Sequence, residues 1–282
     1  MHKNYLKKKL ELFSQHGFFE KIKLVFMWMH DRLLGTSRKG IYELKQLIQN
    51  MGDAAVFQKQ GTNNLITFDG YKVLVRRTSS DVPVFSQVFY YKEYQAVVDA
   101  VRDPQTIRHI IDAGANVGFT SLYLAKQFPD AKIISIEPED QNYAMMLKNF
   151  QLNVCKAIPL KVALWNKREK LGIDRSFRDH RDWAVAVQSG GTDVDGVTIP
   201  DLMATYSMPT IDILKIDIEG AERFIFDTEE HVRQFLPKTR YIAMEIHDEY
   251  QIRDRILNLL KKFHFSYFHH GELTIAVNQK IQ

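Results

Sequence analysis

The residue types best suited to chemistry begin with a glycine-rich segment between two acids. Segment 112–118 has the sequence Asp-Ala-Gly-Ala-Asn-Val-Gly and follows an apolar run, and Glu137 ends the next apolar run. Glycines let the backbone turn sharply and let a ligand approach the main chain. The helix expected after the turn presents free amide groups to an anion, and an acid placed like Glu137 accepts hydrogen bonds from a ribose diol. The pattern predicts a site for a nucleoside-containing cofactor.

The details of this turn favour S-adenosylmethionine over a nicotinamide dinucleotide. The spacing is Gly-x-Asn-x-Gly, whereas dinucleotide folds use Gly-x-Gly-x-x-Gly to seat a pyrophosphate. Asp112 repels a pyrophosphate because both are negative, but it suits the ammonium group of an amino acid. A nicotinamide-dependent oxidoreductase is therefore the weaker alternative. A methyltransferase fold retained as a non-catalytic binding module is another.

Alternating strands and helices are expected to position these residues. The expected strands are 109–112, 132–137, 157–163, 211–216 and 241–246, and the expected helices are 120–127, 140–150 with Asp140 as N-cap, and 252–263. Segments 266–268 and 273–277 predict a terminal antiparallel hairpin. The order predicts an α/β fold: a Rossmann-like class I methyltransferase sheet, mainly parallel and covered on both faces.

The chain is expected to divide into a basic helical N-terminal extension, residues 1–53, and a methyltransferase domain, residues 54–282. Within the domain, Asp69-Gly70 lies between two strand-like runs and predicts a lead-in hairpin over residues 54–78. The cofactor-binding core is expected over residues 107–282. In the extension, Leu6, Leu10 and Phe13 recur at helical spacing.

Charge is unevenly distributed. The whole chain carries a net charge of +4, but residues 1–50 hold ten Lys/Arg and four Asp/Glu, so the remainder is slightly acidic. This distribution argues against a nucleic-acid partner for the main domain. The extension is expected to pack on the core, to form a dimer contact, or to lie against an anionic membrane.

Apolar run 24–29 is far shorter than the ~20 residues of a membrane span. A single cysteine, Cys155, cannot form an internal disulfide. We therefore expect a cytoplasmic protein, with peripheral contact at the inner membrane face as an option.

Several separate motifs together resemble the FkbM family of methyltransferases. They occur in the family's order and cover roughly residues 76–268; the segments are 80–94, 112–118, 136–138, 163–166, 212–222 and 245–248. The resemblance implies methyl transfer from S-adenosylmethionine to a hydroxyl oxygen, on a sugar, a glycan, a glycolipid or a natural product. The predicted cofactor-binding residues are Asp81, Tyr94, Asp112, Ala113, Gly114, Ala115, Asn116, Gly118, Thr120, Ser121, Glu137, Pro138, Ala163 and Asp217.

Catalytic groups are expected where the fourth and fifth strands end, since open α/β sheets bind ligands there. Alternation places Lys215, Asp217 and Glu219 on one side of their strand, and Glu245 and His247 on one side of theirs. A hydroxyl must lose its proton during methylation. The hypothesis is that His247 or Asp217 is the base and that Glu245 orients or tunes it, with Lys215 in the same catalytic group.

Two alternatives for these residues remain open. In the first, Asp217 and Glu219 cap the following helix while Glu245 pairs with Lys215. In the second, Asp217, Glu245 and His247 bind a divalent metal that lowers the pKa of the substrate hydroxyl.

Overall fold

The computed structural model describes residues 47, 49, 51, 54–77, 79–174 and 186–281. The chain divides into two compact units, Met1–Gly52 and Asp53–Gln282. The helices predicted for residues 1–50, and the dimer or membrane contact expected of them, lie outside the described residues except at two helical positions, 47 and 49. No helix in the described ranges is long and apolar enough to cross a membrane.

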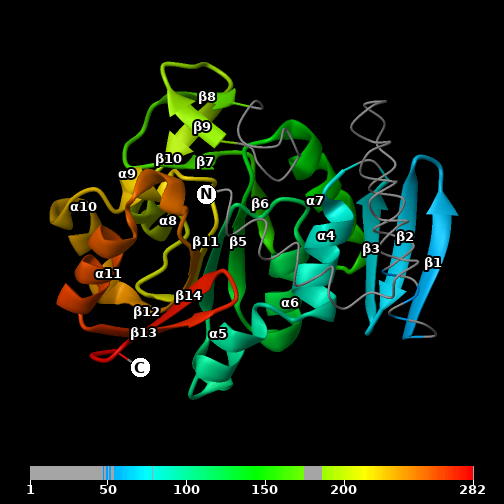
Figure 1. The fold of residues 1–282 in the computed structure, drawn as a ribbon, viewed down its shortest axis with the longest axis horizontal. Helices are drawn as coiled ribbons and strands as arrows, with labels where there is room; N and C mark the ends of the chain where they lie inside the picture. Colours follow the sequence, from blue (N-terminus) through cyan, green and yellow to red (C-terminus); the bar gives the residue numbers. More distant parts are fainter. Residues whose placement is uncertain are drawn as a thin grey trace, which may run out of the picture. The chain divides into compact units, whose positions relative to one another are not determined.

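A seven-stranded sheet forms the centre of the second unit, with the strand order β13-β14-β12-β11-β4-β5-β6 (Figure 1). Its strands are β4 (His109–Ala113), β5 (Lys132–Ile136), β6 (Ile158–Leu160), β11 (Ile211–Ile216), β12 (Thr239–Glu245), β13 (Phe265–His270) and β14 (Leu273–Asn278). β6, β5, β4, β11 and β12 run parallel, while β14 is antiparallel to both β12 and β13. The predicted class I methyltransferase sheet with its terminal antiparallel hairpin is confirmed.

Helices cover both faces of this sheet. They are α4 (Asp81–Phe85), α5 (Gln95–Ala100), α6 (Phe119–Gln127), α7 (Asp140–Leu152), α8 (Ile199–Thr205), α9 (Glu222–Ile225), α10 (Glu229–Arg233) and α11 (Arg253–Lys262). Shorter turns are the π-helix η2 (Ser86–Tyr90) and the 3-10 helices η3 (Pro104–Thr106), η4 (Leu236–Lys238) and η5 (Asp248–Tyr250). Ile111 and Ala113 of β4 join one buried cluster with α8, α10 and α11. Asp112 points the other way, to Ser121 of α6.

The N-cap predicted for α7 is wrong by one residue. Glu139, rather than Asp140, caps this helix, and its side chain accepts hydrogen bonds from the amides of Gln141 and Asn142. Asp140 lies in the first turn instead, where a carboxylate interacts favourably with the helix dipole.

Two smaller sheets extend the unit. β1 (Ala55–Gln60), β2 (Asn63–Phe68) and β3 (Tyr71–Arg76) form an antiparallel sheet, so the hairpin predicted for residues 54–78 gains a third strand. β7 (Ala163–Leu164), β10 (Val194–Val197), β8 (Lys170–Asp174) and β9 (Ala186–Ser189) form the other. The single strand predicted over residues 157–163 is therefore split, because Ala163 pairs with β10 and leaves the central sheet after β6.

Candidate functional site

The glycine-rich turn joins β4 to α6 and is fixed by its neighbours. The amides of Gly114 and Ala115 both donate to the carbonyl of Ile136, at 3.0 and 2.8 Å. Gly114 has φ +79°, and a Cβ at this position would lie 1.7 Å from the main-chain oxygen of Asp217. Only glycine fits there, because the turn packs directly on the backbone that follows β11.

The turn ends at the start of α6. Gly118 is the N-cap, with φ 85°, and no side chain caps the helix, so amides of its first turn remain available to a ligand. Thr120 and Ser121 are buried in this turn. Asn116 has φ 51°, and its side-chain oxygen is buried without a hydrogen bond from the described residues. These groups suit the carboxylate and the donors of an amino-acid ligand.

Glu137 lies just beyond the end of β5, where the sequence pattern placed it. Its two carboxylate oxygens accept hydrogen bonds from the amides of Asn116 at 2.8 Å and Glu139 at 2.9 Å. Burial raises the pKa of Glu137 to about 7, although these two amides oppose the shift. A buried carboxylate that titrates near neutrality and retains unused lone pairs is suited to a diol partner.

A buried network connects Glu137 to the lead-in segment. The carboxylate of Asp81 is fully buried and bidentate to Arg76, with Nε at 3.0 Å and Nη2 at 2.7 Å. Arg76 also donates to Asn142 at 2.7 Å, and Asn142 approaches Glu137 at 3.5 Å. Asp81 therefore reaches the predicted cofactor region through Arg76 and Asn142, two residues that the sequence pattern did not single out.

Asp112 and Lys215 form a buried pair beneath the turn. Their strands are in register at these positions, and Lys215 Nζ lies 3.2 Å from Asp112 Oδ1. Lys215 also donates to the carbonyl of Gly114 at 2.6 Å, and Ser121 donates to Asp112 at 2.5 Å. The expected pairing of Lys215 with Glu245 is wrong, because Lys215 faces its neighbour on β4. Contact of Asp112 with a cofactor ammonium group stays a prediction.

The protonation of this pair is set by its surroundings. Burial lowers the pKa of Lys215, but Tyr94, Asp112 and Asp217 outweigh it and hold that pKa above its ordinary value. Lys215 is therefore a fixed cation that secures the turn and not a proton acceptor. Tyr94, which is also buried, has its pKa raised by burial.

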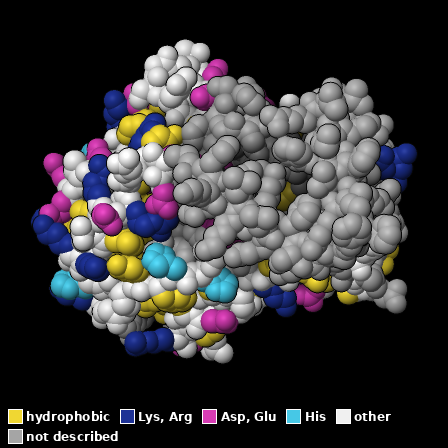
Figure 2. All heavy atoms as spheres, viewed as in Figure 1, with side chains coloured by type: hydrophobic (Ala, Val, Ile, Leu, Met, Phe, Trp, Pro, Cys, Tyr) yellow, Lys and Arg dark blue, Asp and Glu magenta, His cyan; other side chains and the backbone are white. Residues whose placement is uncertain are grey.

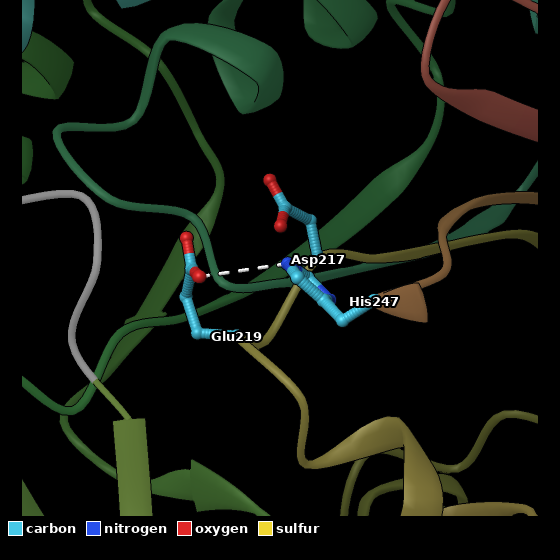
Figure 3. A group of neighbouring side chains, drawn as sticks. All are labelled: Asp217, Glu219 and His247. Carbon is cyan, nitrogen blue, oxygen red and sulfur yellow. Dashed lines mark ion pairs between the residues drawn. The ribbon is translucent and has the colours of Figure 1, made fainter. Parts of the chain in front are cut away.

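A second group of titratable side chains lies where β11 and β12 end. His247 is almost fully buried; its Nδ1 is 3.1 Å from Glu222 Oε1, and its Nε2 is 3.5 Å from Glu219 Oε2 and 3.9 Å from Glu245 Oε1. Figure 3 shows the Glu219 carboxylate facing this imidazole, with Asp217 beside them. We call Asp217, Glu219, Glu222, Glu245 and His247 the carboxylate–histidine cluster.

The path of the chain into this cluster differs from the expected alternation. β11 ends at Ile216, and Glu219 is turned by left-handed backbone conformations, φ 52° at Glu219 and 91° at Gly220. The helix-capping alternative is wrong as well, since the N-cap of α9 is Ala221 and no side chain caps this helix. Glu222 accepts a hydrogen bond from the amide of Ile218 at 3.0 Å and so fixes the turn.

Carboxylates dominate the electrostatics of the cluster. Burial lowers the pKa of His247, but the carboxylates of Glu219 and Glu222 outweigh this and raise it to about 11. Burial raises the pKa of Glu245 to about 9, and the neighbouring Asp217 adds to the shift while His247 opposes it. In this arrangement the imidazole is a cation held by acids.

A cavity of about 530 Å³ adjoins the cluster. It lies between the end of β12 and the turn of the β13–β14 hairpin, and its lining residues are Glu245, Ile246, His247, Asp248, Glu249, Arg253, His269, Gly271 and Glu272. On the part of the face that Figure 2 leaves uncovered by grey atoms, histidine, acidic and basic side chains are interspersed with hydrophobic ones. His269 and His270, at the end of β13, are solvent-exposed, and His269 lines this cavity.

Pro138 and Ala163, two further residues predicted to bind the cofactor, differ in their surroundings. Pro138 directly follows Glu137, while Ala163 begins β7 and is buried in a cluster with Trp165 and Ala221. The structure thus brings the turn, Glu137, Lys215 and Asp217 together, and it places Ala163 in the packing of the smaller sheet.

Known proteins resemble this chain at two levels. Residues 112–269 match the family model described as the Methyltransferase FkbM domain. The methyltransferase sdnD of Sordaria araneosa is 26% identical over 188 residues, which are 54% of this chain and 71% of that protein.

Solved structures give more distant matches. The METTL16 MTase domain, in its second crystal form, is 11% identical with a TM-score of 0.47 and covers 85% of this chain and 91% of that one. An S-adenosylmethionine-dependent methyltransferase from Agrobacterium tumefaciens is 11% identical with a TM-score of 0.46 and covers 83% and 79%.

Proposed function

This chain belongs to the FkbM family of S-adenosylmethionine-dependent methyltransferases, and we propose that it methylates a hydroxyl oxygen on a sugar, a glycan, a glycolipid or a natural product. The cavity beside the carboxylate–histidine cluster carries this proposal. Its wall combines hydrogen-bond acceptors such as Glu272 with donors such as Arg253. A polyhydroxylated acceptor, in which every hydroxyl both donates and accepts, matches such a lining.

The residues of the turn fit the expected cofactor. Glu137 would accept hydrogen bonds from the ribose, and the first turn of α6 with Asn116 would hold the amino-acid portion. The unpartnered side-chain oxygen of Asn116 supports this fit, because a buried acceptor without a donor calls for one from a ligand. When bound, S-adenosylmethionine supplies an electrophilic methyl group on a sulfonium.

Glu245 is the proton acceptor in this proposal, in its ionised form; because its pKa is about 9, the methylation rate should rise as the pH increases toward 9. It lines the cavity and its side chain is 28% exposed, whereas the side chain of His247 is 1% exposed and both its ring nitrogens face carboxylates. The acceptor oxygen forms the new bond to the methyl carbon as the carbon–sulfur bond breaks, its electron pair stays on sulfur, and the hydroxyl proton passes to Glu245. The protein's share of the barrier reduction is alignment and removal of this proton.

Two measurements test the proposal. Titration calorimetry with S-adenosylhomocysteine should show binding, with NAD as the negative control. Incubation with isotope-labelled methyl donor and a panel of saccharides, glycolipids and hydroxylated natural products should give a methoxy signal by NMR. Glu245→Gln should lower kcat about 100-fold or more, within the range for loss of a general base, and leave cofactor affinity unchanged. Methylation of amines in a matched panel, with no methoxy product, would overturn the choice of oxygen.

A further inference from the structure

Within the carboxylate–histidine cluster, three side chains converge on one point. Asp217, Glu219 and His247 each offer one ligand atom, and these atoms all lie within 4.8 Å of one another (Figure 3). Two ligand atoms on opposite sides of one ion lie up to about 4.4 Å apart when each bond is about 2.0–2.2 Å long, so a small side-chain adjustment lets one ion contact all three. The residues come from the turn after β11 and from the residue pair that follows β12.

The orientation of His247 is a separate observation that points to a ligand. Its imidazole is buried, and Nδ1 is held at 3.1 Å by Glu222, whose carboxylate is itself fully buried. Nε2 is directed into the cluster, where carboxylate oxygens lie at 3.5 and 3.9 Å but it makes no hydrogen bond with the described residues. A carboxylate that holds one ring nitrogen while the other points at an acidic group is the arrangement typical of metal-binding histidines.

The charge of the cluster also calls for a cation. Asp217, Glu219, Glu222 and Glu245 surround a single imidazole, and Glu245 lies 3.9 Å from its Nε2. Glu222 is buried and the other three acids are partly exposed, and like charges held this close are costly unless cations compensate them. A divalent ion supplies two positive charges at the point where the carboxylates meet.

We infer that Asp217, Glu219 and His247 bind a divalent metal ion, with Glu222 as the residue that positions His247; the ion takes the place of the proton on His247 Nε2, which is released to solvent on binding. Two carboxylates and one imidazole suit a first-row ion such as Mn²⁺. The inference rests on the proposed hydroxyl methylation for its chemical purpose: an acceptor oxygen bound to the ion would lose its proton more readily, to the adjacent Glu245. The expected set differs from the one suggested by the sequence, because Glu219 replaces Glu245 as a ligand.

The direct test uses Mn²⁺ alone. Full-length protein is treated with a chelator, dialysed and titrated with Mn²⁺, while the free ion is followed by electron paramagnetic resonance. We expect one saturable site in the wild type. Glu219→Gln and His247→Gln should weaken it about 10-fold or more, and Glu222→Gln about 10–100-fold, the range for loss of a residue that orients a ligand.

The matched control is Asp254→Asn, an exposed acid in the first turn of α11, which should bind Mn²⁺ like the wild type. Circular dichroism and S-adenosylhomocysteine titration of every variant show that the fold and cofactor site are intact. If His247→Gln fails to fold, Glu219→Gln, whose side chain is 14% exposed, still decides the question.

Equal Mn²⁺ affinity in wild type and Glu219→Gln, or no binding by the wild type, would overturn the inference. Hydroxyl methylation that persists in chelator would also overturn it and leave the proposed function standing. Saturable Mn²⁺ binding without any methoxy product would support the site and count against the proposed function alone.

Discussion

Two neighbouring regions at one edge of the central sheet differ in how far their acidic side chains are matched by hydrogen-bond donors and cations. At the ends of β4 and β5, acids have matching donors: Asp112 pairs with Lys215 and Ser121, and Glu137 accepts two amides. At the ends of β11 and β12, the described acids outnumber the cations, with His247 as the imidazole that Glu219 and Glu222 share. Each of these carboxylates in the first region has a donor before a ligand binds, whereas the described part of the second region has more acids than cations.

This difference fits a structural role for the first region and a ligand-binding role for the second. A satisfied polar network rigidifies its surroundings and holds one geometry, which suits a cofactor cradle that must be ready before binding. An unbalanced network costs stability until something binds, and any ligand that binds it preferentially stabilises the folded protein. We therefore expect the cofactor region to stay folded without its ligand but to lose stability when one side chain of a buried pair is removed. In the carboxylate–histidine cluster, we expect removal of one acid to be tolerated and ligand binding to raise the stability.

The largest effect is expected at the contact between the two regions. Gly114→Ala places a Cβ against the main-chain oxygen of Asp217, so it should lower the free energy of unfolding by more than about 5 kcal/mol and abolish S-adenosylhomocysteine binding. Gly61→Ala is the control, because Gly61 has a similar φ of +56° but nothing within 4 Å; it should cost only about 1–2 kcal/mol. Urea denaturation measures both, and equal losses would show that steric contact between the regions is unimportant.

Removing one titratable group from each region should give opposite results. Lys215→Met leaves Asp112 buried and unpaired, so it should destabilise the fold by about 3–5 kcal/mol, and Asp112→Asn in the same chain should restore part of this. Glu245→Gln removes a surplus acid and should change stability by less than about 1 kcal/mol, in the stabilising direction. Thermal unfolding of the three variants tests this. A loss in Glu245→Gln as large as in Lys215→Met would remove the distinction between the regions.

Much of the cofactor region was predictable from sequence because local rules determine it. Glycine at positions 114 and 118 signals a turn, and the acid at 137 follows from where a strand ends. The order of apolar runs likewise predicts the central sheet. Its terminal hairpin was confirmed with slightly longer strands than expected.

Contacts between distant segments were not predictable in the same way. Arg76 meets Asn142 across 66 positions of the chain, and no periodicity relates them. Glu219 enters its cluster through a left-handed turn, where the alternation of a strand no longer applies. The hydrogen bonds of Glu222 to Ile218 and His247 likewise depend on how the end of β12 packs against that turn.

The smallest expected effect is a pH dependence of cofactor binding that depends on Glu137. The two amides that donate to this carboxylate do not fully cancel the rise in its pKa that burial causes. The pKa of Glu137 is about 7 in the folded protein against an ordinary value of 4.5, so the folded state favours the neutral form, and the stability contributed by this group falls as pH rises from 4.5 through 7. A ribose diol donates to the ionised form, so cofactor binding should release a proton. S-adenosylhomocysteine affinity should then rise about tenfold from pH 6 to pH 8. Calorimetry in buffers of different ionisation enthalpy measures both the affinity and the number of protons released.

Glu137→Gln should bind S-adenosylhomocysteine more weakly and lose the pH dependence, while Asp140→Asn, which changes an exposed acid on α7, should keep it. A flat profile in the wild type would mean that Glu137 is matched by its amides alone, and that the ligand-sensitive charge of this protein lies entirely in the carboxylate–histidine cluster.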